Sequence, residues 1–219
     1  MNDTESISID KSASKFLYFF IKRIFDIICA IIGIIFLIPI ALIVKIAYML
    51  TGDFTSIFYN HERIGKNGKT FKLYKFRSMV PDADKILEEM LKDPKIEKEY
   101  KKNMKLAHDP RITKIGMVLR KTSIDEMPQF INVLVGDMSM IGNRPYLPRE
   151  KQDMGKYYDD IIKSKPGITG YWQTAGRNNV DFKSRLKLEQ YYSEHMNLWF
   201  DIKIFFKTFS VVLFGRGAQ

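Results

Sequence analysis

Apolar residues are concentrated near the N-terminus of the chain. Residues 27–44 carry no charge and almost no polar side chain. At about 1.5 Å per residue, a helix over this run would match the thickness of a bilayer's hydrocarbon core. A cleaved signal peptide fits poorly, because the run is long and no small-residue cleavage site follows it. The pattern therefore predicts a helix seated in a membrane.

Two features of this segment argue against a straight crossing. Pro39 lies inside the run, where a proline removes a backbone hydrogen bond and kinks a helix. Lysines and arginines flank the run on both sides, and such flanks favour the cytoplasmic face. We therefore predict a flexible tail over residues 1–16 and a re-entrant helix–break–helix over residues 17–50, bent near Pro39. Judged on Pro39 alone, an ordinary kink in a spanning helix is equally open.

The remainder, residues 51–219, is predicted to form one compact domain. An Asn-Gly turn before partly alternating residues 70–76 predicts a short β-hairpin. Amphipathic spacing predicts helices over residues 82–106 (broken at Pro94), 128–135, 156–163 and 181–197. Glycine-rich loops are expected over residues 138–145 and 166–177. The fold class is α-rich with minor β.

The last helical segment, residues 198–213, is apolar and aromatic but is interrupted by Asp201, Lys203 and Lys207. This mixture favours an amphipathic helix lying in the membrane interface. A core helix of the soluble domain fits nearly as well.

Charge and cysteine content narrow the class of partner. The 219 residues carry a formal net charge of +10, which points to nucleic acid, an anionic membrane surface or a phosphorylated substrate. The single cysteine, Cys29, cannot form an internal disulfide. No spacing suggests a zinc site, a Walker motif or a Rossmann fold, which disfavours kinases and dehydrogenases.

The strongest local signal is Thr-Ser-Ile-Asp-Glu-Met-Pro-Gln at residues 122–129. Ser123 with Glu126 matches a capping box. Alternatively, Asp125 is a helix N-cap, which Pro128 favours because proline is tolerated in a first helical turn. On this octapeptide alone, a capping role is at least as good an interpretation as a catalytic one.

The same geometry suits phosphate chemistry. Helix N-termini attract phosphate and keep nearby carboxylates ionised. An ionised Asp125 can attack phosphorus to form an acyl phosphate, while Glu126 can hold Mg²⁺ against a diphosphate. Arginines in turn-forming sequence match phosphate oxygens in pairs, and Arg77, Arg144 and Arg177 are such candidates.

A series of ordered motifs from Lys22 to the C-terminus resembles the bacterial sugar transferases, the small monotopic phosphoglycosyl transferases. The motifs are Lys-Arg-Ile-Phe-Asp at 22–26, Glu-Arg-Ile-Gly-Lys-Asn-Gly at 62–68, Tyr-Lys-Phe-Arg-Ser-Met at 74–79, Leu-Arg at 119–120, Ser-Ile-Asp-Glu-Met-Pro-Gln at 123–129, Asn-Val-Leu at 132–134, Gly-Asp-Met-Ser at 136–139, Gly-Asn-Arg-Pro at 142–145, Lys-Pro-Gly-Ile-Thr-Gly at 165–170 and Gln-Thr-Ala-Gly-Arg at 173–177. The segment 81–109 and the C-terminal residues look most like the undecaprenyl-phosphate galactose phosphotransferases.

This resemblance implies a function and a site. The expected reaction transfers a hexose-1-phosphate from a UDP-sugar to undecaprenyl phosphate through an Asp125 phosphosugar ester, with release of UMP. Glu126 is the expected ligand of Mg²⁺. The expected substrate-binding residues are Lys75, Arg77, Arg120, Arg144, Gln173 and Arg177.

The resemblance also implies a location and partners. The protein is expected at the bacterial inner membrane, in contact with membrane lipids, with its catalytic domain on the cytoplasmic face. No nucleic acid is expected, and a homodimer is a possible assembly. The chain departs from the family pattern at Ile38 (usually Ser), His61 (usually Gln), Asn143 (commonly Pro) and Glu189 (usually Asp).

Two other functions remain open on the sequence. A basic, membrane-tethered module could bind nucleic acid or anionic lipid, and its binding would be salt-sensitive and independent of Asp125. A direct glycosyltransferase would use the same substrates but release UDP in place of UMP.

Overall fold

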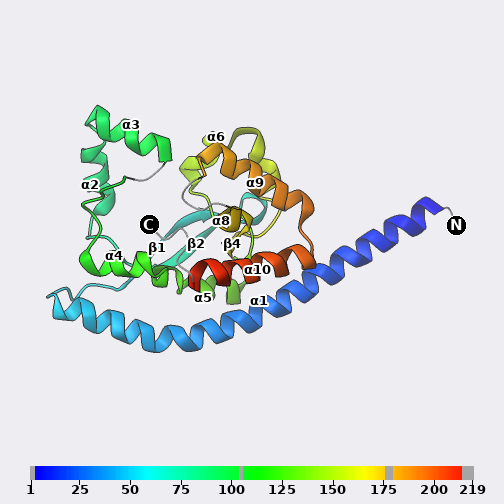
Figure 1. The fold of residues 1–219 in the computed structure, drawn as a ribbon, viewed down its shortest axis with the longest axis horizontal. Coiled ribbons are helices and arrows are strands. Elements are labelled where there is room, and N and C mark those ends of the chain that lie inside the picture. Colours follow the sequence, from blue (N-terminus) through cyan, green and yellow to red (C-terminus); the bar gives the residue numbers. More distant parts are fainter. Residues whose placement is uncertain (1–2, 104–105, 176–179, 214–219) are drawn as a thin grey trace.

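One long helix, α1 (Asp3–Leu50), extends along one side of the molecule in this computed structural model, which describes residues 3–103, 106–175 and 180–213. Figure 1 shows α1 as a bowed rod beneath the other elements, with its first turns projecting beyond them. The break expected near Pro39 is absent, because the helix continues through this residue. Residues 3–16, predicted as a tail, are helical as well. Leu37 and Val44, on either side of Pro39, are both buried against the domain, which holds the two halves in one helix.

After α1 the chain alternates short strands with short helices, of which η1 to η4 are 3₁₀ turns. The elements are β1 (Phe58–Ile64), η1 (Lys66–Gly68), β2 (Thr70–Phe76), α2 (Ala83–Met90), α3 (Pro94–Asn103), α4 (Lys114–Lys121), η2 (Ile124–Glu126), α5 (Gln129–Val135), β3 (Ser139–Ile141), η3 (Pro148–Glu150), α6 (Lys151–Met154), η4 (Gly155–Tyr157), α7 (Tyr158–Ile161), β4 (Gly167–Thr169), α8 (Tyr171–Ala175), α9 (Phe182–His195) and α10 (Leu198–Leu213). The α-rich fold with minor β is confirmed.

The predicted hairpin is formed by β1 and β2, which pair antiparallel with Tyr59 opposite Lys75 and His61 opposite Leu73. The break at Pro94 is also confirmed, because this residue is the first of α3. Proline suits that position, since the first helical N–H has no intrahelical partner.

The two glycine-rich segments predicted as loops contain a parallel pair of strands, β3 and β4. A Cβ on Gly167 would lie 2.1 Å from the Gly142 nitrogen, and one on Gly170 would lie 2.2 Å from the Gly142 oxygen. Glycine here allows two backbones to approach each other, in addition to forming turns.

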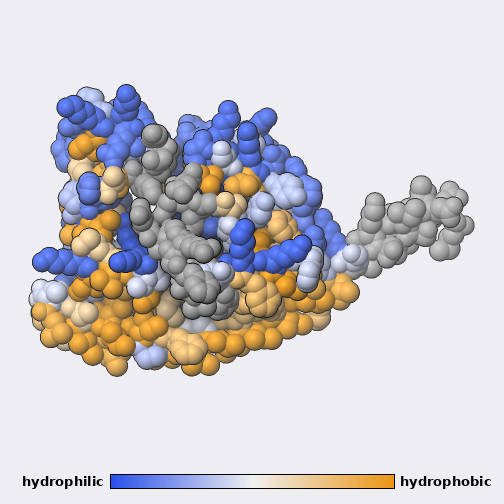
Figure 2. Space-filling view, viewed as in Figure 1, coloured by the Kyte–Doolittle hydropathy of each residue, from blue (hydrophilic) through white to orange (hydrophobic). Residues whose placement is uncertain are grey.

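Helix α1 packs against the domain along one face. Its buried residues recur at intervals of three, four and seven positions: Asp26, Ala30, Gly33, Leu37, Val44 and Tyr48. A Cβ on Gly33 would lie 2.5 Å from the Phe130 ring of α5, so glycine allows the two helices to touch. The opposite face of α1 is apolar and exposed, and Figure 2 shows it as a continuous hydrophobic base beneath a hydrophilic domain.

Polar side chains anchor the N-terminal part of the domain-facing side of α1. Lys22 donates to Asp201 of α10 at 2.6 Å, and Asp26 accepts from the Ser139 hydroxyl at 2.9 Å. Arg23 donates to the carbonyls of Val133 and Leu134, at the end of α5. The Lys-Arg-Ile-Phe-Asp motif therefore joins α1 to three other elements.

The two faces of α10 match the two interpretations of its sequence, one as a core helix and one as an interfacial helix. Asp201 and Ile204 are buried in the domain, as in a core helix, whereas Trp199 and Phe206 are 64% and 68% exposed. The exposed aromatic face is the one that could enter a membrane interface.

Candidate active site

Asp125 and Glu126 lie in the 3₁₀ turn η2, between α4 and α5. Ser123 enters this turn in the left-handed region, at φ +58°, which is strained for a residue with a side chain. Neither capping interpretation is correct, since η2 begins without a side-chain cap and α5 begins after Pro128, also without one. The carboxylates are therefore not explained by helix capping.

Lys75 of β2 contacts both carboxylates. Its ammonium lies 2.9 Å from Glu126 Oε1 and 3.6 Å from Asp125 Oδ2. Asp125 is buried, and burial raises the pKa of its carboxyl above the ordinary value, against the opposing effect of Lys75. Glu126 is more exposed, with 36% of its side chain accessible. The site thus pairs a buried carboxylate with a more exposed one, and the Lys75 ammonium contacts both.

Arg120 is a second cation close to Asp125. Burial lowers the pKa of its guanidinium, while the nearby Asp125 charge opposes that shift. Its Nε donates to the Ser78 hydroxyl at 2.9 Å. Gly116 makes this approach possible, because a Cβ there would lie 1.9 Å from the Ser78 carbonyl oxygen. The structure therefore places Arg120 within electrostatic range of the candidate nucleophile.

The Arg77 guanidinium contacts residues near the end of α1 and not the carboxylate pair. Its Nη2 lies 2.7 Å from Asp53 Oδ2, and its Nε donates to the Ser56 carbonyl. Its guanidinium also stacks over the Tyr48 ring of α1, 4.5 Å from the centroid. The Thr55 hydroxyl and then Arg77 hold the pKa of Asp53 at about 2, so this ion pair is fully formed at neutral pH. These contacts join the end of α1 to β2.

Arg144 lies in a second polar group, beside the fully buried Glu189 of α9. Its backbone N–H donates to Glu189 Oε1 at 2.9 Å. Arg185 lies nearby, with its guanidinium over the Trp172 ring. Gln173, in α8, donates to the Ile168 carbonyl at 3.2 Å. Arg177 falls outside the described residues.

The β1–β2 hairpin links the carboxylate pair at Asp125 and Glu126 to the polar group around Arg144. Tyr59, His61 and Arg63 alternate along β1, and cross-strand pairing places them on the same face as Lys75. Burial and the surrounding cations, first Arg63, then Lys75 and Arg144, lower the pKa of His61 to about 3, so its ring is neutral. A row of basic and neutral donors therefore extends from the carboxylates towards Arg144.

His61, Arg63 and Arg185 were missed as site candidates from the sequence. Period-two alternation along β1 was the available signal for the first two. The spacing of Arg185 and Glu189, four residues apart on one helix, was the signal for the third.

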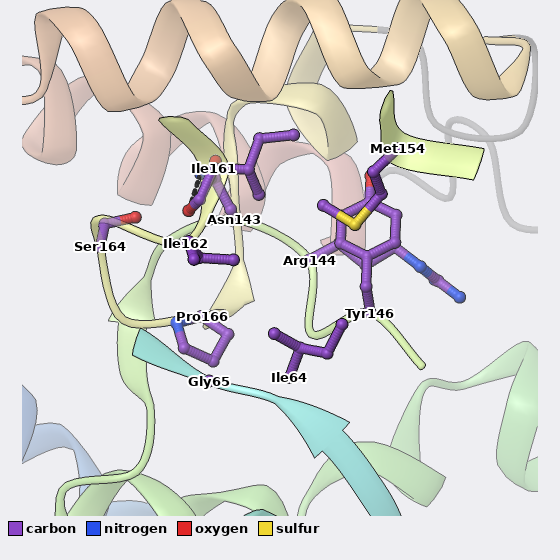
Figure 3. A pocket seen from close by; sticks show the side chains of 10 residues that line it. All are labelled: Ile64, Gly65, Asn143, Arg144, Tyr146, Met154, Ile161, Ile162, Ser164 and Pro166. Carbon is purple, nitrogen blue, oxygen red and sulfur yellow. Dashed lines mark hydrogen bonds between the residues drawn. The ribbon is translucent and has the colours of Figure 1, made fainter. Parts of the chain in front are cut away.

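The cavity drawn in Figure 3 is not a substrate site. It lies behind the Arg144 turn, and its free space of about 10 Å³ is close to that of one water. This cavity is therefore too small to hold a substrate of the size expected from the sequence.

Asp125 and Glu126 supply oxygen ligands of the kind that Mg²⁺ prefers, but not a complete set of them. Among the residues that the structure describes, no three His, Cys, Asp or Glu side chains gather as a complete metal cage. Mg²⁺ is commonly held by one or two carboxylates together with substrate phosphates and water, and the two carboxylates here fit that pattern.

The chain matches the family described as "Bacterial sugar transferase" over residues 17–215. It is 44% identical to the undecaprenyl-phosphate galactose phosphotransferase of Salmonella typhimurium, over 96% of this chain and 43% of that protein. It is 43% identical to the UDP-galactose-lipid carrier transferase of Erwinia amylovora, over 97% of this chain and 44% of that protein.

A third relative is matched over most of its length. The exopolysaccharide production protein ExoY of Sinorhizobium fredii is 41% identical, over 90% of this chain and 87% of that protein. The chain thus spans less than half of the two longer relatives and most of the shorter one. Because the match covers nearly all of the chain, this protein belongs to the bacterial sugar transferase family.

Proposed function

We propose that this protein transfers a hexose-1-phosphate, galactose-1-phosphate or glucose-1-phosphate, from a UDP-sugar to undecaprenyl phosphate. This reaction would begin the assembly of a surface polysaccharide or glycoconjugate. The observation that carries the proposal is the contact of Lys75 with both Asp125 and Glu126, in a turn where neither carboxylate caps a helix. The printed names of two relatives, a galactose phosphotransferase and a UDP-galactose-lipid carrier transferase, support the substrate class.

Asp125 is the proposed nucleophile. Its Oδ attacks the β-phosphorus of the UDP-sugar, an oxygen–phosphorus bond forms, and the bond to the bridging oxygen breaks to release UMP. Lys75 and Arg120 stabilise the ionised carboxylate before attack and the phosphoryl oxygens during it.

The second step returns the enzyme to its starting state. An oxygen of undecaprenyl phosphate attacks the same phosphorus, and the bond to Asp125 breaks. The products are an undecaprenyl diphosphate sugar and the free carboxylate. The electron pair returns to Asp125, so the cycle needs no oxidant or reductant.

Glu126 is the proposed ligand of Mg²⁺. Its side chain is the more exposed of the two carboxylates, and Lys75 contacts it at Oε1. The ion would neutralise diphosphate charge and strengthen UMP as a leaving group. Arg144, together with Gln173 and Arg177, is proposed to hold the nucleotide diphosphate of the donor.

The packing of α1 supports the proposed membrane placement. Its domain-facing residues extend from Asp26 to Tyr48, about 33 Å at the usual helical rise. A straight crossing would carry the domain into the bilayer along that length. Lys22, before the apolar run, and Lys45, after it, both bind domain atoms. We propose that the continuous helix α1 stays on one face of the inner membrane, the cytoplasmic face, with its exposed apolar side in the lipid and its other side against the domain.

The same packing supports access of the proposed nucleophile, Asp125, to a lipid substrate. Ile124 and Met127, on either side of the carboxylates, pack against the cluster that contains Leu37 and Val44 of α1. Asp125 thus lies one layer of side chains above the apolar helix. A lipid phosphate at the membrane surface could reach it without leaving the bilayer.

A homodimer remains a prediction, to be tested by the mass of the solubilised protein.

The released nucleotide tests the proposed reaction. Solubilised protein is incubated with Mg²⁺, undecaprenyl phosphate and a panel of UDP-sugars, beside the Asp125→Asn and Glu126→Gln variants. UMP release that requires Asp125 is expected. UDP release would assign direct glycosyl transfer, and salt-sensitive nucleic-acid binding without nucleotide release would assign a binding module.

A further inference from the structure

Helix α9 holds the Asn143–Arg144 turn through two side chains one helical turn apart. Glu189 Oε1 accepts the Arg144 backbone N–H at 2.9 Å. Four residues later, the Ser193 hydroxyl accepts from Asn143 Nδ2 at 2.7 Å. Residues four apart lie on the same helical face, so both bonds come from one side of α9.

Other bonds fix the rest of this turn. The Gly142 N–H donates to the Thr169 carbonyl at 2.9 Å, and the Asn143 carbonyl accepts from Gly167 at 2.8 Å. Asn143 Nδ2 also donates to the Ile161 carbonyl at 3.1 Å, as Figure 3 shows. With its backbone held on both sides, Arg144 directs its guanidinium away from the small cavity, alongside Tyr146.

The buried charge at Glu189 needs an explanation beyond packing. Its side chain is 0% exposed, and burial of an unpaired carboxylate is costly. Arg144 Nε and Arg185 Nε are both buried without a hydrogen-bond partner among the described residues, and the Tyr146 hydroxyl faces Glu189. A buried acceptor and several buried donors therefore lie directly behind Arg144.

We propose that Glu189 and Ser193 are positioning residues, which fix the direction of the Arg144 guanidinium and couple its hold on the donor diphosphate to the charge of Glu189. This inference rests on the proposed function, in which Arg144 binds the donor. Ser193 acts through Asn143, and Glu189 acts through the Arg144 backbone and through its charge.

The coupling between the charge of Glu189 and donor binding predicts the direction in which affinity changes with pH. Burial raises the pKa of Glu189 to about 7, against the opposing effects first of Tyr146 and then of Arg144 and Arg185, the titratable groups that face it. As the pH falls through this value, Glu189 loses its negative charge and the region around Arg144 becomes more positive. An anionic diphosphate should therefore bind more tightly at pH 6 than at pH 8.

Equilibrium binding tests this inference in the full-length, solubilised Asp125→Asn protein, which cannot form the covalent ester. The probe is the UDP-sugar that gives UMP release in the nucleotide-release panel, because its diphosphate does not titrate between pH 6 and pH 8. Glu189→Gln keeps an oxygen for the Arg144 N–H but removes the charge. Ser193→Ala removes the anchor of Asn143, and Lys187→Gln, at an exposed position of the same helix, is the control.

In the parent protein, the dissociation constant should rise several-fold from pH 6 to pH 8. This dependence should vanish in Glu189→Gln and persist in Lys187→Gln. Ser193→Ala should weaken binding about tenfold, the effect of one lost hydrogen bond. With Asp125 restored, it should raise KM and leave kcat within a factor of about two, because Ser193 does not touch the reacting atoms.

Two results would overturn the inference while leaving the proposed function intact. One is a pH dependence that survives in Glu189→Gln, and the other is a Ser193→Ala protein that loses thermal stability without weaker binding. If no UDP-sugar in the panel yields UMP, the proposed function fails, and the inference fails with it.

Discussion

The Lys75 ammonium, on strand β2 of the hairpin, lies 2.9 Å from Glu126 Oε1 in the neighbouring turn η2. The same nitrogen is 3.6 Å from Asp125, so one cation neutralises two carboxylates that repel each other. Lys75 therefore opposes the rise in the pKa of Asp125 that burial causes. The hairpin therefore has a direct part in preparing the candidate nucleophile.

Replacement of Lys75 by methionine should abolish most of the transfer activity. The change removes the cation that contacts both Asp125 and Glu126, and loss of one such electrostatic group typically costs about 10²- to 10³-fold in kcat. UMP release by Lys75→Met is the measurement. Lys72→Met, an exposed lysine on the opposite face of the same strand, is the control and should keep its activity.

The pH dependence of ester formation should reflect the raised pKa of Asp125. Only the ionised carboxylate attacks, so the rate should fall as the pH falls through this pKa, at a higher pH than for an ordinary aspartate. Lys75 lowers the pKa, so any residual activity of Lys75→Met should be lost at a still higher pH. Single-turnover rates measured across pH test this, and a Lys75→Met profile shifted to lower pH would contradict it.

The sequence predicted the carboxylate pair but not its environment. Asp125 and Glu126 could be identified because a short ordered motif carries them. The contact with Lys75 depends on the pairing of β1 with β2 and on the packing of β2 against η2, which no local pattern contains. Arg77 stands in an equally suggestive motif, yet its ion-pair partner Asp53 lies 24 residues earlier in the chain, in a turn that no motif connects to it.

The junction at Arg77 should contribute to stability and not to donor binding. Asp53→Asn weakens the ion pair that joins α1 to β2, so it should lower the thermal midpoint and leave the KM for the UDP-sugar unchanged. Arg144→Lys is the matched comparison and should raise that KM, because lysine cannot form a bidentate contact with phosphate. Equal increases in KM for both variants would assign Arg77 to the donor.

Gly33 should be essential for the docking of α1. A larger side chain would collide with the Phe130 ring, so Gly33→Leu should destabilise the protein by about 1–3 kcal/mol. Thermal unfolding in detergent is the measurement. Ile35→Ala, on the exposed face of α1, should change the midpoint less, and Phe130→Ala should partly rescue Gly33→Leu. A Gly33→Leu protein of normal stability would contradict the observed α1–α5 packing.

The remaining differences between sequence and structure have a common physical cause. Pro39 predicts a break when only the local hydrogen bond is considered, whereas packing on both sides of it keeps α1 continuous. Gly142 and Gly167 predict loops when considered singly, whereas together they allow β3 and β4 to pair. In both cases, tertiary contacts between distant segments outweigh the local preference.

The central claim is that Asp125 carries the sugar phosphate during the reaction. The most direct test is the intact mass of the solubilised protein after incubation with the UDP-sugar and Mg²⁺, without undecaprenyl phosphate, followed by peptide mapping. We expect a mass increase of one hexose phosphate, located on Asp125, absent from Asp125→Asn and removed when undecaprenyl phosphate is added. UMP release that occurs only with the lipid present, with no adduct on the protein, would contradict a covalent aspartate intermediate.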